Sequence, residues 1–118
     1  MGMSEQAPER AMRPEALTLI AQRFKVLGDP VRLQILQVLH DGERSVSQVI
    51  DAVAVAQSSV SKHLKVLQEA GFVGRRQTGT IVHYRITDPL VWDLCDAVCK
   101  GLQIRLATQA HLLGELPH

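Results

Sequence analysis

Aromatic residues and cysteines are scarce in this chain of 118 residues, and each scarcity excludes a class of protein. Phenylalanine, tryptophan and tyrosine make up 3% of the residues, too few for the stacking platforms that bind single-stranded nucleic acids. Two cysteines are too few for a disulfide scaffold. No apolar run approaches the ~20 residues of a membrane span, and the polar start has no signal-peptide core. We therefore expect a cytoplasmic protein.

Catalytic signatures are missing as well. The chain has no Gly-rich phosphate loop, no HExxH pair and no nucleophile elbow. Cys95 and His111 would lie about 24 Å apart along one helix, at 1.5 Å per residue, which is too far for proton transfer between them. We do not expect an enzyme.

Basic charge is concentrated in one segment, although the net charge of the whole chain is only +1. Between residues 56 and 86 the single acid is Glu69, and the basic residues are Lys62, Lys65, Arg75, Arg76 and Arg85. This segment therefore carries +4, which leaves −3 for the rest of the chain. Such a local excess of cations is typical of a surface that binds a polyanion.

The length of the chain allows one folded domain. Residues 1–13 are polar and lack an apolar period, so we expect a flexible arm there. The folded domain is expected over residues 14–114, and a short tail over residues 115–118. Within it, Leu17, Ile20, Phe24 and Leu27 recur at helical spacing and predict one buried stripe.

The second predicted helix begins at Asp29-Pro30, a cap followed by a first-turn proline. Its apolar residues occupy more than one face, so it should lie deep in the core and run to Gly42. A third, short helix starts at Ser45, where Gln48 completes a capping box.

A fourth helix follows over residues 57–70 and ends before Gly71. Val60, Leu64 and Leu67 face inward at helical spacing, and polar or basic residues cover the other surfaces. Two short helices with a tight connection, the second of them basic outside, predict a helix-turn-helix.

The hydrophobic period then changes from 3.6 to 2. Residues 72–76 and 81–86 read as strands of a hairpin, and the loop between them contains Gly79. A basic hairpin directly after a helix-turn-helix is typical of a wing. Asp88-Pro89 then starts a last helix of roughly 20 residues that ends by Gly114. The predicted fold is mainly α with a small β-hairpin, a winged helix-turn-helix.

Four segments carry a resemblance to a known family: FKVLGDPVRLQIL at 24–36, QSSVSKHLK at 57–65, EAGFV at 69–73 and HYRITDP at 83–89. Together they resemble the ArsR/SmtB family of bacterial winged-helix repressors, over about residues 15–110. The resemblance implies a homodimer joined through the first and last helices and bound to a partly palindromic operator. It also implies an inducer, often a metal or metalloid ion, that lowers the affinity for DNA.

The DNA-binding residues are expected on the fourth helix and the wing. Base edges in the major groove require hydrogen-bonding side chains, and phosphates attract cations. The candidates for the first role are Gln57, Ser58, Ser59, Ser61, Lys62 and His63, and those for the second are Lys65, Arg75, Arg76 and Arg85. A solvated polar face, or a winged helix that contacts another protein, is the alternative. Ala56 stands where the family commonly has a capping Ser or Thr, and His83 is expected to be structural or phosphate-facing.

Inducer sites known in the family are mostly absent from this chain. Residues 45–53 hold no cysteine, Gln37 replaces the second-helix cysteine of sulfide sensors, and the zinc ligands after Asp88 are missing. What remains is Cys95 and Cys99, four residues apart, so that both lie on one face of the last helix. Two thiolates select a soft ion. The resemblance implies arsenite or antimonite, although such sites usually use three thiolates.

Two other roles for the cysteines stay open. Neighbouring thiols could be bridged by oxidation, or take a persulfide, and so form a redox switch. Alternatively both are inert packing residues on an apolar stripe. Asp93 and Asp96 flank the pair and are expected to raise the thiol pKa values, while His111 and His118 are expected to be surface residues.

Overall fold

The structure, a computed structural model, describes residues 11–113. The chain divides between Thr87 and Asp88 into two compact units, each considered by itself. Most of the predicted arm, together with the predicted tail at 115–118 and His118, lies outside the described residues.

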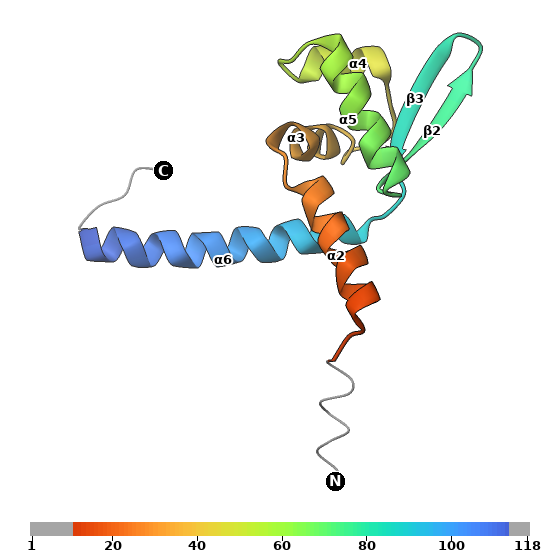
Figure 1. Cartoon of the computed structure of the whole chain (residues 1–118). Helices are drawn as coiled ribbons and strands as arrows, with labels where there is room; N and C mark the ends of the chain where they lie inside the picture. The colour runs from red at the N-terminus through yellow and green to blue at the C-terminus, as the bar shows by residue number, and fades with distance from the viewer. Residues whose placement is uncertain (1–10, 114–118) are drawn as a thin grey trace. The chain divides into compact units, whose positions relative to one another are not determined.

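Over residues 11–87, the first unit holds four helices and a small sheet (Figure 1). The helices are α2 (Pro14–Leu27), α3 (Pro30–Val38), α4 (Val46–Ala52) and α5 (Gln57–Glu69). The strands are β1 (Arg44–Ser45), β2 (Val73–Thr78) and β3 (Ile81–Ile86), antiparallel in the order β1-β3-β2. The second unit is the helix α6 (Leu90–Leu113). The predicted mainly helical fold with a hairpin wing is confirmed.

Capping residues set the starts of two helices as predicted. The Asp29 side chain accepts hydrogen bonds from the backbone N–H groups of Val31 at 2.8 Å and Arg32 at 3.3 Å. Burial alone would raise the pKa of the Asp29 carboxyl, but these N–H groups and the nearby charges of His63 and Arg32 lower it below its ordinary value. The cap is therefore ionised under ordinary conditions.

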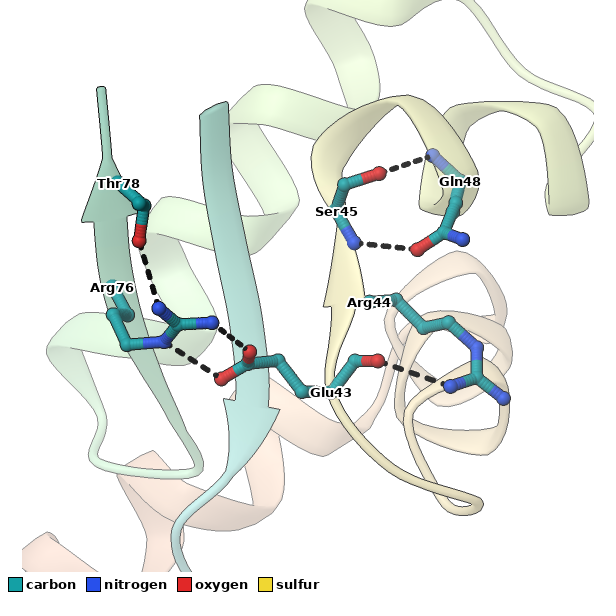
Figure 2. A network of polar contacts seen from close by, with 6 residues as sticks. All are labelled: Glu43, Arg44, Ser45, Gln48, Arg76 and Thr78. Atoms are coloured by element: carbon teal, nitrogen blue, oxygen red, sulfur yellow. Dashed lines mark hydrogen bonds and ion pairs between the residues drawn. The ribbon is translucent and has the colours of Figure 1, made fainter. Parts of the chain in front are cut away.

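Ser45 and Gln48 form the predicted capping box at the start of α4 (Figure 2). The Gln48 N–H donates to the Ser45 hydroxyl at 3.2 Å, and the Ser45 N–H donates to the Gln48 side chain at 2.8 Å. By contrast, α5 begins after Ala56, which makes no side-chain cap. The expected absence of a cap at this helix is confirmed.

The core of the first unit lies among α3, α4 and α5. Its fully buried side chains come from these three helices and are Ile35, Leu36, Leu39, Val49, Val60, Leu64 and Leu67. The three inward-facing residues predicted for α5 are among them. Burial of this apolar area is the main stabilising contribution to the unit.

The burial predicted for α2 was wrong, whereas that for α3 is confirmed at Ile35 and Leu36 but not at Leu33. Of the stripe on α2, Leu27 is buried, but Leu17 is 52% and Phe24 54% exposed. On α3, Leu33 is 40% exposed, and the helix ends at Val38, before Gly42. Periodicity identifies which face of a helix is apolar, but it does not say whether the same chain covers that face.

The hairpin is longer and its turn tighter than predicted. Thr78 pairs with Ile81, so only Gly79 and Thr80 form the loop. Gly79 has φ of +63°, the conformation that a two-residue turn with glycine in its first position requires. The third strand, β1, was not predicted, because two residues are too few to show alternation. Among the described residues, no helix is long and apolar enough to cross a membrane.

Candidate nucleic-acid interface and cysteine pair

The outer face of α5 presents polar and basic side chains to solvent. Leu64 and its two buried companions anchor the helix, so the remaining faces are free of the core. The exposed residues are Gln57, Ser58, Ser61, Lys62 and Lys65, and Ser59 and His63 are half-buried. This face combines hydrogen-bonding groups near the start of the helix with cations further along it.

His63 is hydrogen-bonded to the helix behind it. The Arg32 Nε–H donates to His63 Nδ1 at 3.0 Å, and Arg32 Nη1 donates to the Val26 carbonyl at 3.0 Å. Because a guanidinium only donates, His63 Nδ1 is the acceptor of this hydrogen bond. No local sequence pattern singles out Arg32, because its partner His63 lies 31 residues away.

The wing carries its three arginines on two faces. Successive residues of a strand point to opposite sides, so Arg75 and Arg76 diverge. Arg76 pairs across the sheet with His83, and Arg85 pairs with Gly74, which places Arg76, His83 and Arg85 on one face.

Gly74 is required where it stands. A Cβ there would lie 2.8 Å from the Thr87 methyl and 3.3 Å from Arg85 Cζ. The close approach of these two side chains to the strand therefore excludes a larger residue without local displacement.

Arg76 is paired with Glu43, which precedes β1 (Figure 2). Its Nε–H donates to Glu43 Oε1 at 3.3 Å, its Nη2 donates to Glu43 Oε2, and its Nη1 donates to Thr78 Oγ1 at 2.8 Å. The hydrogen bond from Arg76 holds the pKa of the Glu43 carboxyl below its ordinary value, and the pairing raises the pKa of Arg76. Glu43 was not singled out from the sequence, because 33 residues separate the partners.

His83 lies at the centre of the sheet, opposite both Arg76 and Ser45. Its Nδ1 is buried and has no hydrogen-bond partner within the part of the chain that the structure describes. The buried Nδ1 is consistent with a structural role for His83, one of the two roles expected from the sequence.

Cys95 and Cys99 lie one turn apart on α6, Cys95 half-buried and Cys99 exposed. Burial raises the pKa of the Cys95 thiol, and the Asp96 carboxylate raises it further. Over residues 11–113, no group of three or more His, Cys, Asp or Glu side chains could hold a metal ion. One chain thus supplies two thiols and no described third ligand beside them.

Comparison with known proteins identifies the family to which this chain belongs. The model of the bacterial regulatory proteins of the arsR family matches residues 29–74, from the cap of α3 into β2. A transcriptional repressor SmtB homolog from Synechocystis is 32% identical over 99 residues, which cover 80% of this chain and 75% of the relative. The chain belongs to the ArsR family.

A second relative of this ArsR-family chain is a probable mercury resistance operon repressor from Streptomyces lividans. It is 38% identical over 74 residues, 63% of this chain. The chain spans only 59% of the length of that relative.

Solved structures agree with the family. The chain matches the structure of Rv0081 from Mycobacterium tuberculosis with a TM-score of 0.72 and 32% identity, over 84% of this chain and 99% of that one. It also matches the homodimeric winged helix-turn-helix DNA-binding domain of Mb0332 from Mycobacterium bovis, with a TM-score of 0.58 and 29% identity, over 88% and 91%. These likenesses agree with the winged-helix fold of this ArsR-family chain, and its relatives are named as transcriptional regulators and repressors.

Proposed function

We propose that this repressor binds a specific operator as a homodimer and is released when a thiophilic inducer binds Cys95 and Cys99. The observation that carries the proposal is the exposed polar and basic face of α5, followed by a wing rich in arginine. The main alternative, a winged helix that contacts proteins, does not require this concentration of cations.

The DNA end would work by two kinds of contact. Gln57 and Ser58, at the start of α5, are placed to reach base edges in the major groove, where the first residues of a recognition helix read sequence. Lys65, together with Arg75 and Arg85 of the wing, would contact phosphates, which adds affinity through counterion release. Ser59, Ser61, Lys62 and His63 complete the candidate reading surface.

The dimer would form through α2 and α6. Leu17 and Phe24 on α2 are exposed, as are Val98, Leu102 and Ile104 on α6. Apolar faces of this extent mark association surfaces, and the homodimeric structural neighbour supports pairing of two copies. Two-fold symmetry would place the two copies of α5 about one turn of DNA apart, roughly 34 Å.

The sensor would be the cysteine pair on α6. Thiolates prefer soft ions, and the inducer we propose is arsenite or antimonite. Because the described residues of one chain supply two thiols, a third would come from the partner subunit or from an exogenous thiol. Binding on the dimer helix would change the spacing of the two α5 helices. A coupling of ~1–3 kcal/mol is typical of such allosteric control.

A thiol switch without a metal is the second candidate, and the spacing of the cysteines favours it. Side chains four residues apart on a helix are neighbours, so oxidation or a persulfide could link them. The raised pKa of Cys95 opposes this role, because thiolate is the reactive form.

The test is fluorescence anisotropy of the reduced protein on the DNA upstream of its own gene, titrated with arsenite. Wild type should release the DNA, and the double variant Cys95→Ser, Cys99→Ser should stay bound. Ala97→Ser, an exposed position between the two cysteines, is the matched control and should respond like wild type.

Other outcomes separate the candidates. Tight DNA binding without an arsenite response would remove the metalloid proposal, and release by oxidant or persulfide would then identify the thiol switch. If neither acts, the cysteines are packing residues. Absence of duplex binding would overturn the DNA-binding role itself.

A further inference from the structure

All three guanidinium nitrogens of Arg76 donate hydrogen bonds within the protein. Nε and Nη2 both donate to the two oxygens of Glu43, and Nη1 donates to Thr78 (Figure 2). A two-pronged contact of this kind is how arginine also binds a phosphate. The carboxylate therefore occupies the same N–H groups that a DNA phosphate would use.

The other wing arginines differ from Arg76. Arg75 makes one hydrogen bond, from Nη2 to the Gln77 side chain at 3.2 Å. The Arg85 side chain has no hydrogen bond or ion pair among residues 11–113, and its guanidinium lies over Gly74. Both side chains are exposed, so both can reach a phosphate without breaking an ion pair.

Glu43 is an acid in a basic environment. The hydrogen bond from Arg76 lowers the pKa of the Glu43 carboxyl, and the charges of Arg76, His83 and Arg85 lower it further. If a phosphate were to take Arg76, the carboxylate would lose its partner and face a second anion. Like charges that close together are unfavourable, so phosphate contact at Arg76 is penalised twice.

We propose that Glu43 withholds Arg76 from DNA, so that Arg76 positions the wing strand while Arg75 and Arg85 make the phosphate contacts of the wing. Through this pair, β2 is joined to the segment that leads into β1. The inference rests on the proposed DNA-binding function and assigns within it which cations of the wing act on the phosphates. It revises the role expected for Arg76 from its charge alone.

The experiment measures the salt dependence of binding to a fluorescein-labelled duplex of the DNA upstream of the gene. Each phosphate contact contributes about 0.9 to the slope of log affinity against log salt concentration. Arg75→Gln and Arg85→Gln should each reduce the slope by about 0.9 per bound subunit. Arg76→Gln should leave the slope unchanged.

Glu43→Gln provides the second arm. It frees the Arg76 guanidinium, so the slope should rise by about 0.9 per bound subunit, and adding Arg76→Gln should return it to the wild-type value. Asp41→Asn is the matched control. Asp41 is exposed and lies two residues before Glu43, so the change removes the same charge without affecting the Arg76 pair. It should leave the slope unchanged. Circular dichroism checks that each variant is folded, and Arg76→Met, which also removes the charge, replaces any Arg76→Gln variant that is not.

Three results would overturn the inference. These are a loss of slope in Arg76→Gln equal to that in Arg75→Gln, no loss in Arg75→Gln and Arg85→Gln, or an unchanged slope in Glu43→Gln. A wild-type protein that does not bind the duplex would instead refute the proposed function, so the two failures are distinguishable.

Discussion

The two units of the chain treat their apolar residues in opposite ways. In the first, α3, α4 and α5 bury Ile35, Leu36 and Leu64 almost completely. In the second, α6 exposes Leu102 to 52% and Ile104 to 70%. The first unit therefore has a core of its own, whereas much of the apolar surface of α6 has no cover within the described chain. We infer that the apolar residues of the first unit are buried when the chain folds, and that those of α6 are buried when a second copy of the chain associates with it.

The largest effect is expected from Leu64→Ala in the first unit. The side chain is 1% exposed, and removing a buried leucine costs about 2–5 kcal/mol through lost burial and the cavity left behind. Urea unfolding followed by circular dichroism measures the loss. Lys65→Ala, at the exposed neighbouring position, should change the unfolding free energy little. A loss below about 1 kcal/mol in Leu64→Ala would contradict the assignment of the core.

Leu102→Ala should act on association instead. Leu102 is 52% exposed, so a partner subunit that covers it buries about half of the side chain in each subunit, worth about 1.5–3 kcal/mol per dimer. Its loss raises the dissociation constant of the dimer about 10- to 200-fold. Sedimentation at several protein concentrations measures the constant, and Arg105→Ala on the same helix is the control. An unchanged dimer would show that this face of α6 is not part of the interface.

Ser45→Ala should lower the stability of the first unit by about 1 kcal/mol, because the Gln48 N–H at the start of α4 loses its acceptor, the Ser45 hydroxyl. The reverse change, Ala56→Ser, supplies the missing cap of α5 and should add a fraction of that value. Neither should change the dimer constant. Thermal unfolding at fixed concentration is the measurement, and equal stability in Ser45→Ala would refute the role of the cap.

The smallest expected effect is a difference in the rate of chemical modification between the two cysteines, both of which lie on α6. Cys99 is exposed and Cys95 is half-buried with a raised thiol pKa, so iodoacetamide should modify Cys99 first at neutral pH. The rate at Cys95 should keep rising into alkaline pH, as its thiol ionises. Mass spectrometry of a time course follows both sites, and the Cys99→Ser variant isolates Cys95. Faster modification of Cys95 would contradict this order.

Much of the DNA-binding surface was predictable from the sequence. The exposure of Lys62 and Lys65 follows from the helical spacing of Val60, Leu64 and Leu67, because inward positions on a helix determine which positions point outward. From their charge alone, however, Arg75 and Arg76 were both expected to contact phosphates. Only the fold shows that one of them is paired with Glu43.

What the sequence by itself determined is local. The caps at Asp29 and Ser45 and the turn at Gly79 depend on groups within a few residues of each other, whose geometry the backbone sets. Tertiary structure alone decided the Arg76–Glu43 and Arg32–His63 contacts, the third strand and the exposure of Phe24. These features join segments about 30 or more residues apart, or depend on which elements cover a helix face. A hydrophobic or charge pattern shows that a side chain is apolar or charged. Which element covers the apolar face, or which residue pairs with the charge, is set by the packing of the whole chain.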